Sequence, residues 1–197
     1  STGMSAESEI VDSIACLESL GAKFALLHCN STYPTPLKDI NLAYLGRLKE
    51  LSRGRLVGYS GHERGYLVPI AAVALGARIV EKHLTLDREM EGNDHRVSLL
   101  PDEFARMVAD IRAIEEATGG IETRKISQGE LINRESLAKS LVANTDISRG
   151  SIISRDMVEI RSPGRGIQPD RIDELVGKKA VRDIRSGDFF YKADLVE

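Results

Sequence analysis

The sequence predicts an α/β domain followed by a small β-rich domain, and three features of the pattern lead to this prediction. Helix-length amphipathic segments alternate with short apolar runs as far as Gly119. Those runs are almost continuously apolar, which is typical of parallel strands buried on both faces. From Ser140 onward, short strand-like runs alternate with turn residues. The chain has 197 residues and is 42% hydrophobic, which suits one or two globular domains.

The first part of the chain alternates helices and strands along its length. Ser5 is the expected N-cap of the first helix, and Gly21 is expected to end it. The remaining elements are predicted from periodicity: strands over 24–29, 56–59 and 78–80, and helices over 37–52, 68–77 and from 101 to 118. This order is that of half a (β/α)8 barrel, which needs about 250 residues when complete.

The domain boundaries follow from changes in this pattern. Residues 1–120 form the half barrel, and 121–137 are charged without clear periodicity, so we interpret them as a linker. Residues 138–197 form the β-rich domain, with strands near 140–143 and 158–161 and a short helix near 169–175.

Charge and cysteine content exclude several classes of partner. A formal net charge of −3 gives no electrostatic case for binding nucleic acid or a membrane surface. No apolar run approaches the roughly 20 residues of a membrane span. Cys16 and Cys29 are the only cysteines, and their contexts indicate reduced thiols in a cytoplasmic protein.

Polar residues follow two consecutive predicted strands. Ser60 and His62 come after the first, and Glu81, Lys82 and His83 after the second. Parallel neighbours lie about 4.8 Å apart, so both imidazoles can lie at one end of the sheet, where barrels carry their active sites. The sharper interpretation is a divalent metal held by two imidazoles, and the plainer one is a pair of hydrogen-bonded structural histidines. Lys82 and Glu81 are predicted to form an ion pair at the strand end.

Four segments resemble the sialic acid synthase family. They are Ser-Thr-Gly-Met at 1–4, Leu-Leu-His-Cys-Asn-Ser-Thr-Tyr-Pro-Thr-Pro at 26–36, Gly-Tyr-Ser-Gly-His-Glu at 58–63, and Glu-Lys-His-Leu-Thr-Leu-Asp with Gly-Asn-Asp-His at 81–87 and 92–95. Residues from about 140 are similar to that family's C-terminal antifreeze-like (SAF) domain. The resemblance therefore implies the C-terminal half of a (β/α)8 TIM barrel followed by a SAF domain of the β-clip type.

The resemblance implies a carbon–carbon bond-forming transferase. Family members condense phosphoenolpyruvate with N-acetylmannosamine or a related N-acyl hexosamine, giving a sialic (nonulosonic) acid and phosphate. It places His62 and His83 as catalytic metal ligands, usually for Mn2+ or Mg2+. Two imidazoles are a weak cage for such hard ions, so water and substrate oxygens must complete the coordination.

The same resemblance implies the substrate contacts. Ser1, Ser31 and Ser60 match phosphate-contact positions, although many family members have Asn where Ser31 stands. Tyr33 matches a position beside the sugar, and Asp94 one on its hydroxyl groups. In the family's β-rich domain, an arginine just before a Pro-Gly pair reaches the sugar's N-acyl group. Here Ser162 holds that place, and Arg161 and Arg165 are the candidates on either side.

The resemblance also bears on the state of the chain. The family's acid/base glutamate and phosphate-binding lysine come from the first half of the barrel, so we expect this chain to be a portion of a longer enzyme, inactive alone. It implies a domain-swapped homodimer as well. Two other hypotheses stay open: a non-catalytic carbohydrate-binding or interaction module built on 140–197, and a different two-histidine metal lyase or aldolase.

Overall fold

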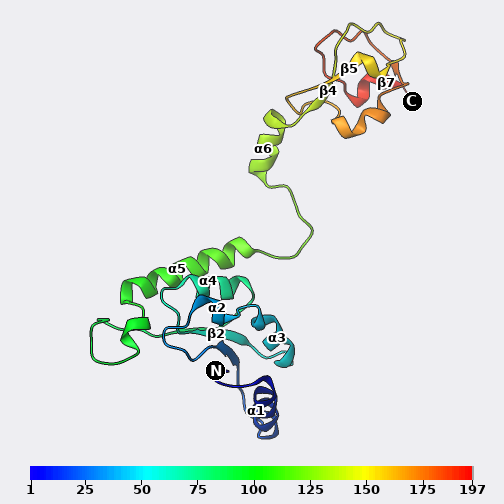
Figure 1. Ribbon diagram of the computed structural model, residues 1–197. Coiled ribbons are helices and arrows are strands. Elements are labelled where there is room, and N and C mark those ends of the chain that lie inside the picture. The colour runs from blue at the N-terminus through cyan, green and yellow to red at the C-terminus, as the bar shows by residue number, and fades with distance from the viewer. Residues whose placement is uncertain (197) are drawn as a thin grey trace. The chain divides into compact units, whose positions relative to one another are not determined.

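The computed structural model describes residues 1–196 of the chain, and Figure 1 shows their course. The chain divides into two compact units: the first is Ser1–Ile121 and the second begins at Glu122. Each unit has its own hydrophobic core.

A three-stranded parallel sheet is the centre of the first unit. Its strands are β1 (Leu26–Cys29), β2 (Val57–Gly61) and β3 (Val80–Lys82), in the order β1-β2-β3. An isolated parallel bridge between Leu84 and Leu99 follows β3. Parallel neighbours joined through helices confirm the predicted α/β class and the strand arrangement of a partial (β/α)8 barrel.

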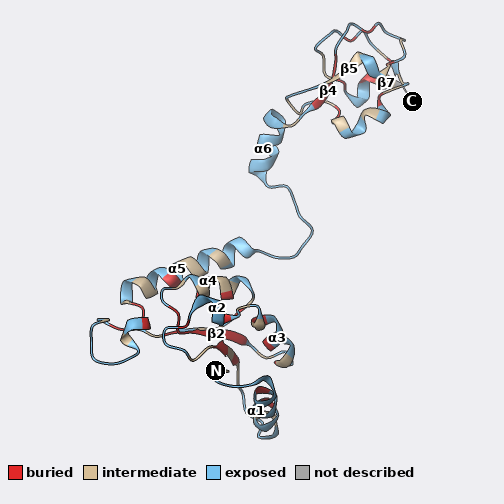
Figure 2. Ribbon diagram, viewed as in Figure 1, coloured by how far each residue is buried: buried red, intermediate tan, exposed pale blue. Residues whose placement is uncertain are grey.

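Helices pack on this sheet because their apolar residues join those of the strands in one core. In Figure 2 β2 is buried throughout, as its residue-by-residue burial also shows. Leu48 and Ala72 are fully buried against the sheet, and α4 (Leu67–Ala74) packs beside α5 (Pro101–Thr118) in Figure 1. The helices are α1 (Glu7–Ser19), α2 (Leu37–Ile40), α3 (Tyr44–Leu51), α4 (Leu67–Ala74), η1 (His95–Val97) and α5 (Pro101–Thr118).

The structure corrects several predicted boundaries. The single helix expected over 37–52 is split, because Asn41 adopts a left-handed conformation (φ 49°) between α2 and α3. The first helix has Ala6 as its N-cap, so the cap predicted at Ser5 is wrong. Strands β2 and β3 begin one and two residues later than predicted, and each ends two residues later, because pairing with the neighbouring strand extends up to Gly61 and Lys82.

The second unit is β-rich, as predicted. Strand β4 (Ser140–Ala143) pairs antiparallel with β5 (Val158–Arg161), and β6 (Lys179–Ala180) pairs antiparallel with β7 (Leu195–Val196). Phe190 is the largest fully buried side chain of its core. Three short 3-10 helices connect the strands: η2 (Arg155–Met157), η3 (Pro169–Glu174) and η4 (Lys192–Asp194).

The segment interpreted as a linker contains a helix that the sequence analysis missed. Helix α6 (Gln128–Leu137) begins with a capping box, in which Ser127 and Glu130 bond reciprocally. None of its residues is buried, and Figure 2 shows it exposed along its length. Without a buried stripe there is no apolar periodicity to detect, whereas the Ser127-x-x-Glu130 spacing was the available signal.

Within residues 1–196, every helix is too short or too polar to cross a membrane.

Candidate functional site

The sheet register brings the polar residues of the strand ends together. Cys29 lies opposite Ser60, and Gly61 lies opposite Lys82. His62 follows β2 directly and His83 follows β3, so both leave the same edge of the sheet. Their ring centroids are 5.1 Å apart, in an edge-to-face arrangement. The neighbouring placement expected for the two histidines is therefore present.

The backbone of the loop after β1 fixes the orientation of His62. The His62 Nδ1 atom is 2.7 Å from the Asn30 carbonyl oxygen, which can only accept, so Nδ1 carries the proton. The Nε2 lone pair is then available, and it lies 3.0 Å from the Tyr33 hydroxyl. His62 is only 5% exposed, so this orientation is held within the fold. A carbonyl that accepts from the other ring nitrogen commonly orients metal-binding imidazoles in this way.

Tyr33 and Asp94 complete the cluster around the two imidazoles. The Tyr33 ring lies 4.1 Å from that of His62 and 5.8 Å from that of His83, measured between centroids. His83 Nδ1 is 3.7 Å from an Asp94 carboxylate oxygen. Desolvation, followed by the acidic groups nearby, raises the pKa of the Tyr33 phenol. The hydroxyl is therefore protonated at neutral pH and donates to His62 Nε2.

The two imidazoles fit a divalent cation in part. His62 presents a pre-oriented Nε2, and His83 is adjacent and 29% exposed in its side chain. Across residues 1–196, however, no cluster of three or more histidine, cysteine or carboxylate side chains is arranged to hold a metal. A cation here would rely on water or substrate oxygens for its remaining positions.

The three serines matched to phosphate contacts differ in their surroundings. Thr2, the residue after Ser1, donates to the Leu27 carbonyl through both its amide and its hydroxyl. These two hydrogen bonds hold the N-terminal segment alongside β1. Gly3 packs so tightly on Ser31 that a Cβ at Gly3 would lie 2.0 Å from the Ser31 hydroxyl oxygen. The Ser60 hydroxyl is buried and donates to Glu81 (2.7 Å), so it would have to turn from this carboxylate to meet a phosphate.

A buried ion pair lies directly beside the two histidines. Lys82 Nζ is 2.9 Å from Glu63 Oε1 and also donates to the Glu63 backbone carbonyl. The Tyr59 hydroxyl donates to Glu63 Oε2 at 2.6 Å. The predicted partner of Lys82 was Glu81, and this is wrong: adjacent residues of a strand point to opposite faces, so Glu81 bonds Ser60 instead.

Burial shifts the pKa of both partners of Glu63, Lys82 and Tyr59. Desolvation is the main cause that lowers the pKa of Lys82, and the neighbouring Glu63 carboxylate opposes it. Desolvation, followed by the hydrogen bond to Glu63, raises the pKa of Tyr59. Tyr59 is therefore a neutral donor at neutral pH.

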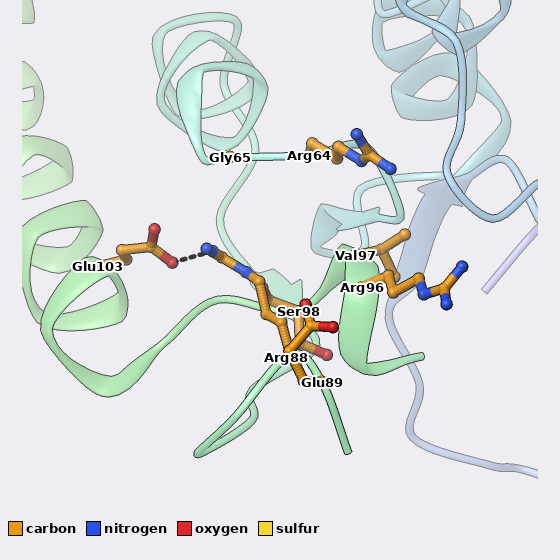
Figure 3. Close-up of a pocket in the computed structure, with 8 residues that line it drawn as sticks. All are labelled: Arg64, Gly65, Arg88, Glu89, Arg96, Val97, Ser98 and Glu103. Atoms are coloured by element: carbon orange, nitrogen blue, oxygen red, sulfur yellow. Dashed lines mark hydrogen bonds and ion pairs between the residues drawn. The ribbon is translucent and has the colours of Figure 1, made fainter. Parts of the chain in front are cut away.

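A polar cleft of about 700 Å3 extends from the histidine cluster. Tyr33 and Asp94 line it together with Arg64 and Arg96. Figure 3 shows the side chains of Arg64 and Arg96 extending to one side of an adjoining pocket, whereas Arg88 turns the other way to pair with Glu103. Glu89 and Glu91 also line the cleft, so its walls offer donors and acceptors of both charges.

The two candidate arginines belong to the second unit, on either side of the Ser162-Pro163-Gly164 turn. Arg161 ends β5 and forms an ion pair with Glu159 (2.8 Å). Arg165 is exposed, and within residues 1–196 no ion pair involves it. The buried Ser140 hydroxyl fixes the turn by donating to the Pro163 carbonyl (2.8 Å) and accepting from the Gly166 amide (2.9 Å).

Sequence reasoning missed three neighbours of the site. Glu63 was not assigned a role although it belongs to the 58–63 motif, and its alternation with Gly61 and Tyr59 at every second residue was the available signal. Cys29 Sγ lies 3.7 Å from His62 Nδ1, a contact between consecutive strands that no local pattern shows. Arg64 directly follows the same motif but joins the cleft only through the fold.

Comparison with known proteins agrees with this architecture. Residues 1–123 match the NeuB family and residues 138–196 match the SAF domain. The chain is 41% identical over 189 residues to the N,N'-diacetyllegionaminic acid synthase of Campylobacter jejuni, covering 94% of this chain and 56% of that protein. It is 36% identical over 189 residues to the human N-acetylneuraminate-9-phosphate synthase, covering 95% and 52%.

A solved structure gives the same result. The N-acetylneuraminic acid (sialic acid) synthetase of Leptospira borgpetersenii is 36% identical, with a TM-score of 0.59 over 68% of this chain and 48% of that one. The chain spans about half the length of the curated relatives it matches. These relatives are nonulosonic acid synthases by name, and the predicted family and SAF domain are confirmed. The chain belongs to the NeuB family, with a SAF domain as its second unit.

Proposed function

We propose that this chain carries the metal-binding and acceptor-binding part of a nonulosonic acid synthase that condenses phosphoenolpyruvate with an N-acyl hexosamine. One observation carries the proposal: His62, His83, Tyr33 and Asp94 meet at the carboxyl edge of the parallel sheet, beside a polar cleft. This edge is where barrel enzymes place their chemistry. The synthase names of the relatives support the same activity.

The acceptor sugar would occupy the cleft beside Tyr33. Its hydroxyl groups would donate to the exposed Asp94 carboxylate, which can accept several hydrogen bonds at once. Arg64 and Arg96, which line the same cleft, would supply donors to the sugar. The Tyr33 phenol, held protonated by its raised pKa, would donate to a sugar oxygen after leaving His62 Nε2.

His62 and His83 would hold a divalent cation, Mn2+ or Mg2+, through their imidazole nitrogens. Bound there, the cation would supply Lewis-acid polarisation of the aldehyde oxygen of the open-chain sugar. The Asn30 carbonyl keeps the Nδ1 proton of His62 in place, so Nε2 is the atom presented to the site. Ser1, Ser31 and Ser60 would donate hydroxyl protons to the phosphate of phosphoenolpyruvate.

The release of phosphate from phosphoenolpyruvate tests the proposed function. Phosphate release from phosphoenolpyruvate should be measured for the natural gene product with N-acetylmannosamine and Mn2+, with a chelator control. We expect release that the chelator stops, and a loss of at least 100-fold in His62→Ala and His83→Ala, because each variant removes half of the protein's ligands. His28→Ala is not a suitable control, because His28 is buried and bonds the Ile40 carbonyl (2.7 Å). Arg106→Ala is a suitable control, because Arg106 is exposed.

The outcomes separate the alternatives. Phosphate release that is unchanged in both histidine variants would refute the proposal. Sugar binding without any release or metal binding would favour a carbohydrate-binding module, and turnover of other aldehydes without phosphoenolpyruvate would favour a lyase or aldolase. We expect the 197-residue polypeptide on its own to be inactive, because a three-stranded sheet supplies only part of an eight-stranded active site.

The second unit is proposed to cover the acceptor site of a partner subunit in a domain-swapped homodimer. Of the two candidate arginines, Arg165 is the stronger, since Arg161 is already paired with Glu159. The independent core of this unit supports its use as a separate cover. Arg165→Ala should raise the KM for the acceptor, whereas Arg161→Ala should change it less, and light scattering should report a dimer mass.

A further inference from the structure

We propose that Glu63 and Lys82 act as positioning residues that hold His62 and His83 at the separation the metal site requires. The inference rests on the proposed function, because it concerns the same two imidazoles. The ion pair joins the residue directly after His62 to the residue directly before His83. It therefore links the two strand ends at the point where each histidine leaves the sheet.

The pair acts from the face of the sheet opposite the substrate side. Side chains alternate along a strand, and Ser60 bonds Glu81 across β2 and β3 on the face that the histidines share. Tyr59 and Lys82 point to the other face, where Tyr59 belongs to the helix-packed core. The β2 and β3 ends are thus linked on both faces, by a hydroxyl–carboxylate bond on one and an ion pair on the other.

The ion pair is buried and multiply bonded, unlike an ordinary surface salt bridge. The side chains of Lys82 and Glu63 are 0% and 2% exposed. Lys82 Nζ reaches both the carboxylate and the backbone carbonyl of Glu63, and Tyr59 occupies the second carboxylate oxygen. Because Lys82 bonds the main chain itself, displacing its ammonium group would release the backbone immediately after His62.

Gly61 shows that the local sequence is adapted to this arrangement. A Cβ at Gly61 would lie 2.7 and 2.8 Å from the two carboxylate oxygens of Glu63 and 2.7 Å from Tyr59 Cε1. The Glu63 carboxylate therefore fills the space that a side chain at residue 61 would occupy. It also follows that an aspartate at residue 61 would place its own carboxylate there, within reach of Lys82.

Metal affinity is the direct test, measured on the natural gene product without substrate. The concentration of free Mn2+ is measured from its EPR signal, and the free energy of unfolding is measured by urea titration of the same protein variants. The variants are Glu63→Ala, the relocated-carboxylate variant Gly61→Asp/Glu63→Ala, and the apolar triple variant Tyr59→Phe/Glu63→Leu/Lys82→Met. The triple variant removes both charges and leaves no polar side chain of the three unpaired, although the backbone carbonyl of residue 63 loses its bond from Lys82.

We expect Glu63→Ala and the triple variant to weaken Mn2+ binding about tenfold, the lower end of the range for changes outside the ligand shell. The relocated carboxylate should recover the affinity to within about threefold, because Lys82 regains its partner. A folded triple variant that binds Mn2+ as the natural protein does would overturn the inference, and so would a folded relocated-carboxylate variant that stays as weak as Glu63→Ala.

Failure of the proposed function is recognised separately. If Mn2+ binding survives His62→Ala, these imidazoles are not the metal site, and the proposed function fails whatever the Glu63 variants do. If His62→Ala abolishes binding and the Glu63 variants do not weaken it, only the positioning role is refuted. If the triple variant does not fold, the comparison of Glu63→Ala with Gly61→Asp/Glu63→Ala decides.

Discussion

Replacing Gly61 by alanine should destabilise the protein strongly although it adds a single methyl group. The methyl carbon would lie within 2.8 Å of both Glu63 carboxylate oxygens, well inside van der Waals contact. The carboxylate cannot move away freely, because Tyr59 holds one oxygen at 2.6 Å and Lys82 holds the other at 2.9 Å.

The magnitude follows from what the methyl displaces. Overpacking a well-packed interior costs about 1–3 kcal/mol. Separating a buried ion pair, so that one charge is left without its partner, costs about 3–5 kcal/mol. The methyl moves the carboxylate without removing it, so the loss should lie at the top of the overpacking range and the bottom of the ion-pair range. We therefore expect the free energy of unfolding to fall by about 3 kcal/mol.

Urea titration followed by far-UV circular dichroism measures this loss. Gly46→Ala is the matched control: Gly46 lies in α3 with no atom within 4 Å of an added Cβ, so it should gain about 0.5–1 kcal/mol from helix propensity. In a Glu63→Ala background the added methyl at Gly61 no longer meets the carboxylate, although it still lies 2.7 Å from Tyr59 Cε1, so it should cost less than it does in the natural protein. The reasoning is refuted if Gly61→Ala unfolds at the same urea concentration as the natural protein.

Three further substitutions test separate parts of the structure. Tyr33→Phe removes the hydroxyl 3.0 Å from His62 Nε2 and should raise the acceptor KM about fivefold, near the net value of one hydrogen bond; an unchanged KM would contradict the acceptor assignment. Ser140→Ala leaves the Pro163 carbonyl and Gly166 amide without their partner and should cost about 1–3 kcal/mol in urea titration, against less than about 0.5 kcal/mol for exposed Ser136→Ala. Asn41→Val should cost about 1–2 kcal/mol because of its left-handed backbone, whereas Asn41→Gly should not; equal effects would contradict the helix break.

The sequence predicted most of the fold because its signals are local. Apolar periodicity identified every strand of the parallel sheet and its helices, since each element must bury a stripe or a face. It failed where burial is absent or a single backbone angle intervenes. Helix α6 has no buried residue to set a period, and Asn41 breaks a continuous apolar pattern through its φ angle alone.

The candidate site, too, could be predicted from local sequence only in part. The motifs around His62 and His83 were sufficient to predict adjacent imidazoles, because parallel strands one strand–helix repeat apart end at the same edge of the sheet. The choice of Lys82's partner was beyond local reasoning. Glu81 is adjacent in sequence but on the opposite face, whereas Glu63 is brought to the ammonium by strand pairing.

By itself, then, the sequence determined the fold class, the family resemblance and the positions of the two histidines, all of which depend on periodicity and short motifs. Only the tertiary structure decided which side chains surround those histidines. The Asn30 carbonyl that orients His62, and the Lys82 ammonium that pairs with Glu63, come from segments that meet through sheet register and loop closure. Contacts of that kind depend on distances in space, and local sequence pattern does not encode them.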